Sequence, residues 1–181
     1  PEYPGGFGQD INFTLSLIRW SCKTLIDINN QHHLNDPLLK EWQNLVTNLV
    51  DFQTDDNGLR IGKDIPFSKP HRHYSHLLGF YPLAVITPEK EENKKLLRTS
   101  LDHWLNVTIN SGIVVDEMPI TAYTATGASS MYACLGDGEK ALYYLDFLIK
   151  HKNITPTTMY AEGGNPVIES PLSFATSLHD M

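Results

Sequence analysis

The sequence predicts an all-α fold built from helical hairpins. In several long segments, apolar residues recur every three or four positions, which is the spacing of one face of a helix. Alternation of apolar and polar residues, the pattern of a half-buried strand, is uncommon in the 181 residues. The predicted helices come in pairs joined by turns, and pairs of this kind build helical bundles and toroids.

The first predicted hairpin occupies residues 10–52. Asp10 is a suitable N-cap for a helix whose apolar residues fall on one face. The segment N-Q-H-H-L-N-D-P interrupts this pattern, and Asp36-Pro37 supplies a cap and a first-turn proline for a second helix. Turn residues at 54–58, T-D-D-N-G, end the hairpin.

The segment with the most functional groups runs from Lys69 to Pro82, K-P-H-R-H-Y-S-H-L-L-G-F-Y-P. Pro70 favours a loop at its start, and the apolar residues that follow predict a helix ended by Gly79 and Pro82. We therefore expect the polar cluster at the point where a loop enters a helix. Loop ends on a helical scaffold often carry binding and catalytic groups.

Four more helices are predicted after this segment. The first follows a cap at 87–89, and the second, at 120–135, is rich in small residues, which let helices approach closely. A Gly-Asp-Gly turn joins it to a partner helix at 139–151. The last helix begins near Leu172 and is interrupted by the end of the sequence at Met181, so we expect a fragment of a longer polypeptide.

The composition excludes several classes of protein. With 41% apolar and 10% aromatic residues, the chain can form a folded core. The charge of −7 comes without long runs of one sign, so nucleic acid, which needs a basic surface, is not an expected partner. No apolar run approaches the roughly 20 residues of a membrane helix, and we expect no membrane span. Cys22 and Cys134 fall in apolar helical patterns and are predicted to be buried free thiols.

Three interpretations of His71, Arg72, His73 and His76 are open. Histidines at this spacing can ligate a metal ion, although no cysteine or carboxylate flanks them and Arg72 would repel a cation. The cluster can instead form a polar wall that donates hydrogen bonds to an uncharged or anionic ligand, with the guanidinium as a planar fork of donors. In the third interpretation the histidines are buried against backbone carbonyls, which can hold for His76 even if His73 contacts a ligand.

Two carboxylates are predicted in loops rather than on exposed helix faces. Glu2 lies between two prolines, and Glu169 lies in the segment V-I-E-S-P. Less polar surroundings favour the protonated form of a carboxyl group, which a general acid needs. A glycosidase uses a separated pair of carboxylates. Each glutamate taken alone is more typical of an ordinary surface or capping residue. Aromatic side chains such as Tyr123 would suit stacking on sugar faces, although most aromatic residues are expected in the core.

The sequence resembles glycoside hydrolase family 95, the inverting α-L-fucosidases, in four places. Residues 71–82 contain the family pattern H-R-H-x-S-H-L-x-x-x-Y-P in full. Pro1-Glu2 resembles the family's S-P-E loop, and residues 135–138 resemble its L-G-D-G turn. The end of the chain, I-E-S-P-L-S-F-A-T-S-L-H-D-M, aligns without gaps with the family's I-D-G-N-F-G-x-T-x-G-I-A-E-M.

This resemblance implies that residues 1–181 form a single domain, the C-terminal portion of an (α/α)6 barrel. It implies hydrolysis of a terminal α-linked L-fucose, or a related sugar such as L-galactose, with inversion; we expect no metal or other cofactor. Glu2 would be the general acid and Glu169 would occupy the place of the base. The residues expected to bind the sugar are His71, Arg72, His73 and Tyr123. The expected partner is an oligosaccharide or glycan, and the expected location is secreted or periplasmic.

Two departures from the family pattern bear on activity. Glu169 stands where the family has an aspartate, which lengthens the base by one methylene. Tyr123-Thr124 occupies the place of a tryptophan-serine pair. The alternative function is therefore a non-catalytic carbohydrate-binding relative that keeps the H-R-H segment. A helical scaffold for protein interactions is a third possibility, and it leaves the loop histidines unexplained.

Overall fold

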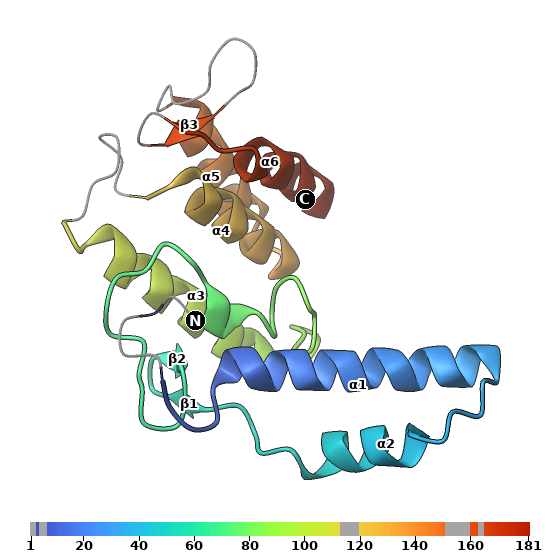
Figure 1. The fold of residues 1–181 in the computed structure, drawn as a ribbon. Helices are drawn as coiled ribbons and strands as arrows, with labels where there is room; N and C mark the ends of the chain where they lie inside the picture. Colours follow the sequence, from blue (N-terminus) through green and yellow to red (C-terminus); the bar gives the residue numbers. More distant parts are fainter. Residues whose placement is uncertain (1–2, 4–6, 113–119, 151–159, 163–164) are drawn as a thin grey trace. The chain divides into compact units, whose positions relative to one another are not determined.

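The computed structural model describes residues 3, 7–112, 120–150, 160–162 and 165–181. The chain divides into two compact units, Pro1–Phe67 with Ser75–Thr87 and Ser68–Tyr74 with Pro88–Met181. In the described residues both units are built mainly from α-helices, with strands only in short two-residue pairs (Figure 1). The predicted all-α class is confirmed.

The first unit contains one long helix against which a shorter one packs (Figure 1). Its elements are α1 (Asn12–His32), α2 (Leu39–Asn48), β1 (Thr54–Asp55), β2 (Gly58–Leu59) and the 3-10 helix η1 (Ser75–Leu77). The predicted cap at Asp10 is wrong, because Asp10 has a positive φ of 53° and the residue before the helix is Ile11. The oxygen Oδ1 of Asp36 accepts a hydrogen bond from the Leu38 backbone at 2.8 Å. The predicted cap at Asp36 and first-turn proline at Pro37 are nevertheless wrong, because α2 begins at Leu39 with Leu38 as its N-cap.

Asn12 joins the start of α1 to the segment that carries the β1–β2 hairpin. Its buried side-chain amide donates to the carbonyls of Gln53 at 2.8 Å and Arg60 at 2.7 Å, and its side-chain oxygen accepts from the Gln53 backbone at 2.8 Å. The Asn12 backbone N–H adds a fourth bond, to the carbonyl of Ile61 at 2.9 Å. A buried amide that is bonded in this way fixes the register of two segments at little cost in desolvation.

The helix predicted near Gly79 and Pro82 is wrong. In the described chain this region has only the three residues of η1, followed by turns. A Cβ on Gly79 would lie 2.8 Å from Oγ of Ser16 and 3.2 Å from the ring of Phe52. The apolar residues around Gly79 are therefore buried by close packing against α1. They do not need to form a helix to be buried.

The second unit is arranged around α4, which packs against both α5 and α6 (Figure 1). Its elements are α3 (Glu91–Ile109), α4 (Ala122–Cys134), α5 (Gly138–Lys150), β3 (Ala161–Glu162), β4 (Asn165–Pro166) and α6 (Glu169–Asp180). The last helix begins at Glu169 and not near Leu172, as the sequence predicted. Strands β3 and β4 form an antiparallel pair in the segment between α5 and α6.

Small residues on α4 allow the neighbouring helices to approach, as the sequence predicted. Ala125 and Ala128 are fully buried. Hydroxyl groups of α4 bond directly to hydroxyl groups of α6 across the interface. The Oγ atoms of Thr126 and Ser173 lie 2.8 Å apart, and those of Ser130 and Ser177 lie 3.0 Å apart. Hydroxyl groups are bonded here because a buried polar group without a partner would cost stability.

The turn between α4 and α5 is closed by Asp137. Gly136 has a φ of 76°, which a glycine adopts without strain, and Asp137 then caps α5 by accepting a hydrogen bond from the Lys140 backbone at 3.1 Å. The Asp137 carboxylate also pairs with Arg98 of α3 at 2.6 Å. These two contacts, the Arg98 bond first, lower the pKa of Asp137.

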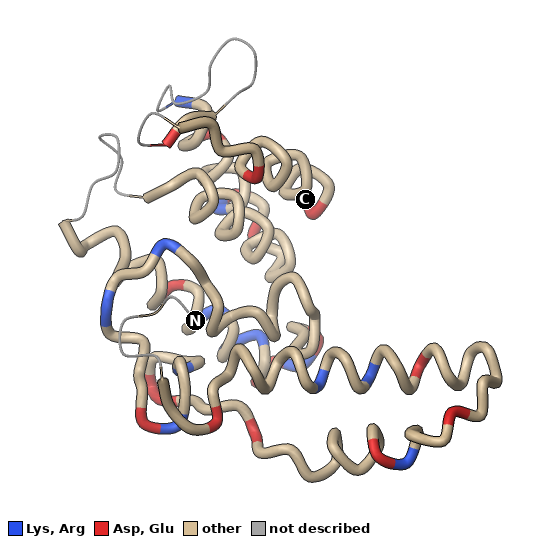
Figure 2. Tube along the Cα trace, viewed as in Figure 1, with Lys and Arg blue, Asp and Glu red and all other residues tan. Residues whose placement is uncertain are grey.

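The described helices carry no span that is both long and apolar enough to cross a membrane. Charges of both signs are interspersed along the described chain (Figure 2). Cys22 is buried, as predicted. The prediction that Cys134 is buried is wrong, because this residue ends α4 and its side chain is exposed.

We expect Asp137→Asn to have a lower melting temperature than the wild type at pH 7. This difference in melting temperature should become smaller when the pH falls to 3. The pKa of Asp137 is lower in the folded than in the unfolded chain, so its stabilising effect is present above the unfolded value and disappears as the pH falls through the folded value. Asparagine keeps the cap and removes the charge, whereas Asp137→Ala removes both and should cost about 1 kcal/mol more.

Thermal unfolding at several pH values measures this difference. Glu139→Gln, two positions away on the exposed start of α5, is the matched control. A stability difference between the wild type and Asp137→Asn that stays constant from pH 7 to pH 3 would contradict the role of the charge.

Candidate functional site

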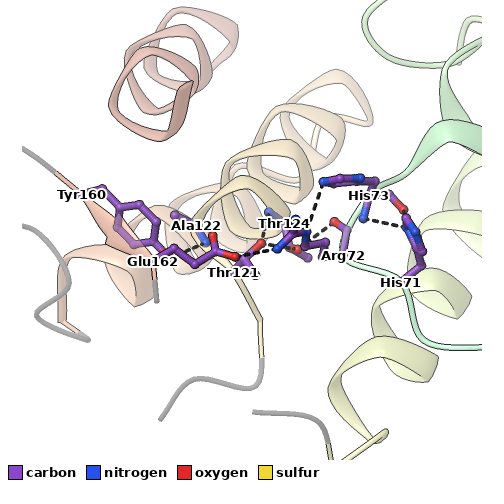
Figure 3. A network of polar contacts seen from close by, with 8 residues as sticks. All are labelled: His71, Arg72, His73, Thr121, Ala122, Thr124, Tyr160 and Glu162. Carbon is purple, nitrogen blue, oxygen red and sulfur yellow. Dashed lines mark hydrogen bonds and ion pairs between the residues drawn. The ribbon is translucent and has the colours of Figure 1, made fainter. Parts of the chain in front are cut away.

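The backbone of His71 and Arg72 is held by side chains of two helices. The indole of Trp104 donates to the His71 carbonyl at 2.9 Å, and the Thr108 hydroxyl lies 3.2 Å from the same oxygen. The Thr124 hydroxyl donates to the Arg72 carbonyl at 2.9 Å (Figure 3). Because α3 supplies the first two bonds and α4 the third, this loop has one defined course across the second unit.

Tyr74 anchors the end of the loop by packing. Its ring stacks on Tyr123 with the centroids 5.3 Å apart and meets Trp104 edge-on, also at 5.3 Å. A Cβ on Gly127 of α4 would lie 2.3 Å from the Tyr74 ring, which is closer than atoms can approach. Glycine at this position is therefore what allows the ring to lie on α4.

His71 and His73 form a tight turn in which their rings contact each other. The backbone N–H of His73 donates to Nδ1 of His71 at 3.1 Å, and the two rings meet edge-on at 5.3 Å. The His73 ring also meets Tyr123 edge-on at 5.6 Å. Its Nε2 atom accepts a hydrogen bond from Nε of Arg72 at 3.3 Å.

Arg72 forms an ion pair with Glu162, which the sequence analysis missed. The distance between Nη1 of Arg72 and Oε1 of Glu162 is 2.7 Å, and Figure 3 shows the two residues in one network. The Arg72 side chain is 55% exposed, whereas that of Glu162 is 15% exposed. The residues are 90 positions apart, so no spacing rule connects them; the only local signal was an acidic residue in front of two glycines.

The segment before Glu162 is attached to the start of α4. The Ala122 backbone donates to the hydroxyl of Tyr160 at 3.3 Å, and the Tyr160 carbonyl accepts from the Val167 backbone at 2.9 Å. Thr121 caps α4 by accepting a hydrogen bond from the Thr124 backbone at 3.4 Å. The first turn of α4 thus holds both the loop of Arg72 and the strand of Glu162 (Figure 3).

The structure brings together four of the predicted site residues. His71, Arg72, His73 and Tyr123 share one surface of the second unit, as the contacts above show. His76 lies on η1 of the first unit, where it is buried and stacks on Phe67 with the centroids 4.4 Å apart. For His76, burial is therefore confirmed, against an aromatic ring.

The two predicted carboxylates have different outcomes. The expectation that Glu169 lies in a loop is wrong, because it is the first residue of α6 and its side chain is exposed. Ser170, in the first turn of this helix, is buried, and Ser173 and Ser177 bond to hydroxyl groups of α4. Glu2 lies outside the described residues.

The cluster offers chemistry for binding hydroxyl groups. A guanidinium supplies donors, a carboxylate supplies acceptors, and two histidines with a tyrosine supply aromatic edges and faces. Within the described residues, no group of three metal-ligating side chains occurs. The arrangement can therefore bind a polar, uncharged ligand through several hydrogen bonds.

A comparison with protein families finds one match relevant to this site. The family model described as Glycosyl hydrolase family 95 catalytic domain matches residues 7–168. The matched range includes the loop of Arg72, the start of α4 and Glu162. A comparison with curated proteins found no match.

We expect Gly127→Ala to destabilise the chain and disturb the loop of Arg72. The added methyl group would force the Tyr74 ring away from α4; overpacking of about 1–3 kcal/mol outweighs the roughly 1 kcal/mol gained in helix propensity. Chemical unfolding measures the loss. Gly138→Ala is the matched control, since a Cβ there meets nothing within 4 Å.

A double-mutant cycle tests the cause. In the background of Tyr74→Ala, the cost of Gly127→Ala should disappear, because the clashing ring is gone. An equal cost in both backgrounds would show that the ring is not what requires a glycine at position 127.

Proposed function

Because the chain belongs to glycosyl hydrolase family 95, we propose that it removes a terminal α-linked L-fucose, or a related sugar such as L-galactose, from an oligosaccharide or glycan. The family is one of glycoside hydrolases. The observation that carries the finer proposal is the shared surface of Arg72, His73 and Tyr123, held by α3 and α4. A terminal sugar offers hydroxyl groups for the first two and an apolar ring face for the third.

The proposed division of labour separates binding from chemistry. Arg72 and His73 hold sugar hydroxyls, with His71 fixing the turn between them, and Tyr123 contacts the sugar ring. Glu2 protonates the leaving oxygen and Glu169 activates a water molecule on the opposite face. Inversion requires the two carboxyl groups to be roughly 6.5–9.5 Å apart, with room for that water.

The wider setting is also proposed from family membership. We infer that residues 1–181 are the C-terminal portion of an (α/α)6 barrel and that the protein acts outside the cytoplasm, as a secreted or periplasmic enzyme. The helix pairs α1–α2 and α4–α5 support the first inference, since a barrel of this kind is made of such hairpins. Glycans are also common substrates outside the cell.

We expect Glu169→Gln and Glu2→Gln in the full-length protein each to lower kcat on nitrophenyl α-L-fucoside, Glu2→Gln by the smaller factor because nitrophenolate leaves with little need of a proton. Loss of a general acid or base typically costs about 10²–10⁴-fold. The measurement is release of nitrophenol from α-L-fucoside and α-L-galactoside, together with the anomeric configuration of the first sugar released, read by NMR. Inversion predicts the β-anomer from an α-linked substrate.

Glu92→Gln is the matched control, because Glu92 is exposed in the first turn of α3 and distant in sequence from every proposed site residue. A Glu169→Gln variant with the kcat of the wild type would remove Glu169 from the mechanism. First release of the α-anomer would contradict inversion.

A second function is favoured by the position of Glu169. Its side chain is exposed on α6, and among the described residues no hydrogen bond or ion pair holds it. A base that orients water is usually fixed by such partners, so this observation favours a non-catalytic, carbohydrate-binding relative. Binding of L-fucose by the wild type without turnover of either nitrophenyl glycoside would support this alternative.

A further inference from the structure

We propose that Glu162 determines the charge specificity of the site by neutralising and orienting Arg72, so that the pair selects uncharged sugars over anionic ones. This inference rests on the proposed function, namely that the surface of Arg72 and His73 binds a sugar. It starts from the 2.7 Å ion pair between Arg72 and Glu162. Glu162 is here a positioning residue, because it acts through the guanidinium.

The ion pair is not needed to hold its two segments together. The loop of Arg72 is fixed to Thr124 through a backbone carbonyl, and the strand of Glu162 is fixed to Ala122 through Tyr160. With the Arg72 side chain 55% exposed, the ion pair contributes little to stability. A role in ligand recognition accounts for its presence better than a role in folding.

The guanidinium keeps most of its hydrogen-bonding capacity for a ligand. Of its five N–H donors, one bonds to Glu162 and one to His73, and the remaining three have no acceptor among the described residues. The two bonds lie on Nη1 and Nε, so they hold the plane of the guanidinium in one orientation. A ligand therefore meets donors that are already directed.

The charge of Glu162 decides which ligands these donors accept. An isolated arginine attracts a carboxylate most strongly, because two parallel charge-assisted hydrogen bonds can form. Beside Glu162 a second carboxylate meets repulsion from the first, and like charges across an interface oppose binding. A sugar hydroxyl avoids this repulsion, since it can accept from the guanidinium and donate to the carboxylate at the same time.

The test compares two sugars that differ only at C6, L-galactose and L-galacturonate, binding to the full-length protein. We expect the wild type to bind L-galactose at least about tenfold more tightly than L-galacturonate. In Glu162→Gln, which keeps the shape and one acceptor, affinity for L-galacturonate should rise about tenfold while affinity for L-galactose changes by less than about threefold. The gain should shrink as the salt concentration rises.

Turnover separates positioning from chemistry. On nitrophenyl α-L-galactoside, Glu162→Ala should raise KM about tenfold with kcat nearly unchanged, and Glu162→Gln should restore KM, because glutamine again holds the guanidinium. Glu92→Gln is the control for loss of a distant exposed carboxylate. Equal melting temperatures of all variants would show that these effects do not come from unfolding.

The outcomes distinguish the two proposals. If the wild type binds and hydrolyses the neutral sugar but Glu162→Gln leaves the preference between the two sugars unchanged, the role of Glu162 is overturned and the proposed function stands. If the wild type binds neither L-fucose nor L-galactose and hydrolyses neither nitrophenyl glycoside, both proposals are overturned. A rise in L-galacturonate affinity that does not depend on salt would also contradict the charge mechanism.

Discussion

The contact between the ring of Tyr74 and Gly127 is the packing constraint on which the arrangement of the site depends. Any Cβ at position 127 would overlap the ring, so the stack of Tyr123, Tyr74 and Trp104 can lie on α4 only over a glycine. This stack brings the preceding backbone within hydrogen-bonding distance of Trp104 and Thr124. Packing of the Tyr74 ring thus determines the course of the loop that contains Arg72. The hydrogen bonds to the His71 and Arg72 carbonyls then fix the orientation of its backbone.

The composition of α4 explains why so much is attached to it. Its small residues bring α6 and the loop of Arg72 close, and its hydroxyl groups then require partners because they are buried. Ser130 forms a hydrogen bond with Ser177, and Thr126 forms one with Ser173. Because its side chains are small, α4 stabilises the unit through close helix packing and hydrogen bonds. A helix rich in leucine would instead do so by burying a large apolar surface area.

The described site is organised for recognition more than for reaction. Arg72 is fixed by Glu162 and His73, whereas Glu169 lies exposed at the start of α6. Family membership assigns hydrolysis to the chain as a class of activity. Among the residues proposed to carry out that reaction, Glu169 departs from the family pattern, whereas Glu2 resembles it. Among the residues proposed to bind the sugar, His71, Arg72 and His73 agree with the pattern and Tyr123 departs from it. Substrate recognition and turnover can therefore be tested separately in this protein.

The sequence by itself determined the helices of both units and the family, because helical periodicity and a contiguous motif such as residues 71–82 are local properties of the chain. It also predicted Arg72, His73 and Tyr123 as site residues, and the structure places them in contact in one unit. Only the tertiary structure decided that His76 lies in the other unit, and that Gly79 is needed for close packing and not to end a helix. It alone identified Glu162, whose partner is 90 positions away. Such contacts depend on how distant segments pack, and no pattern of neighbouring residues encodes them.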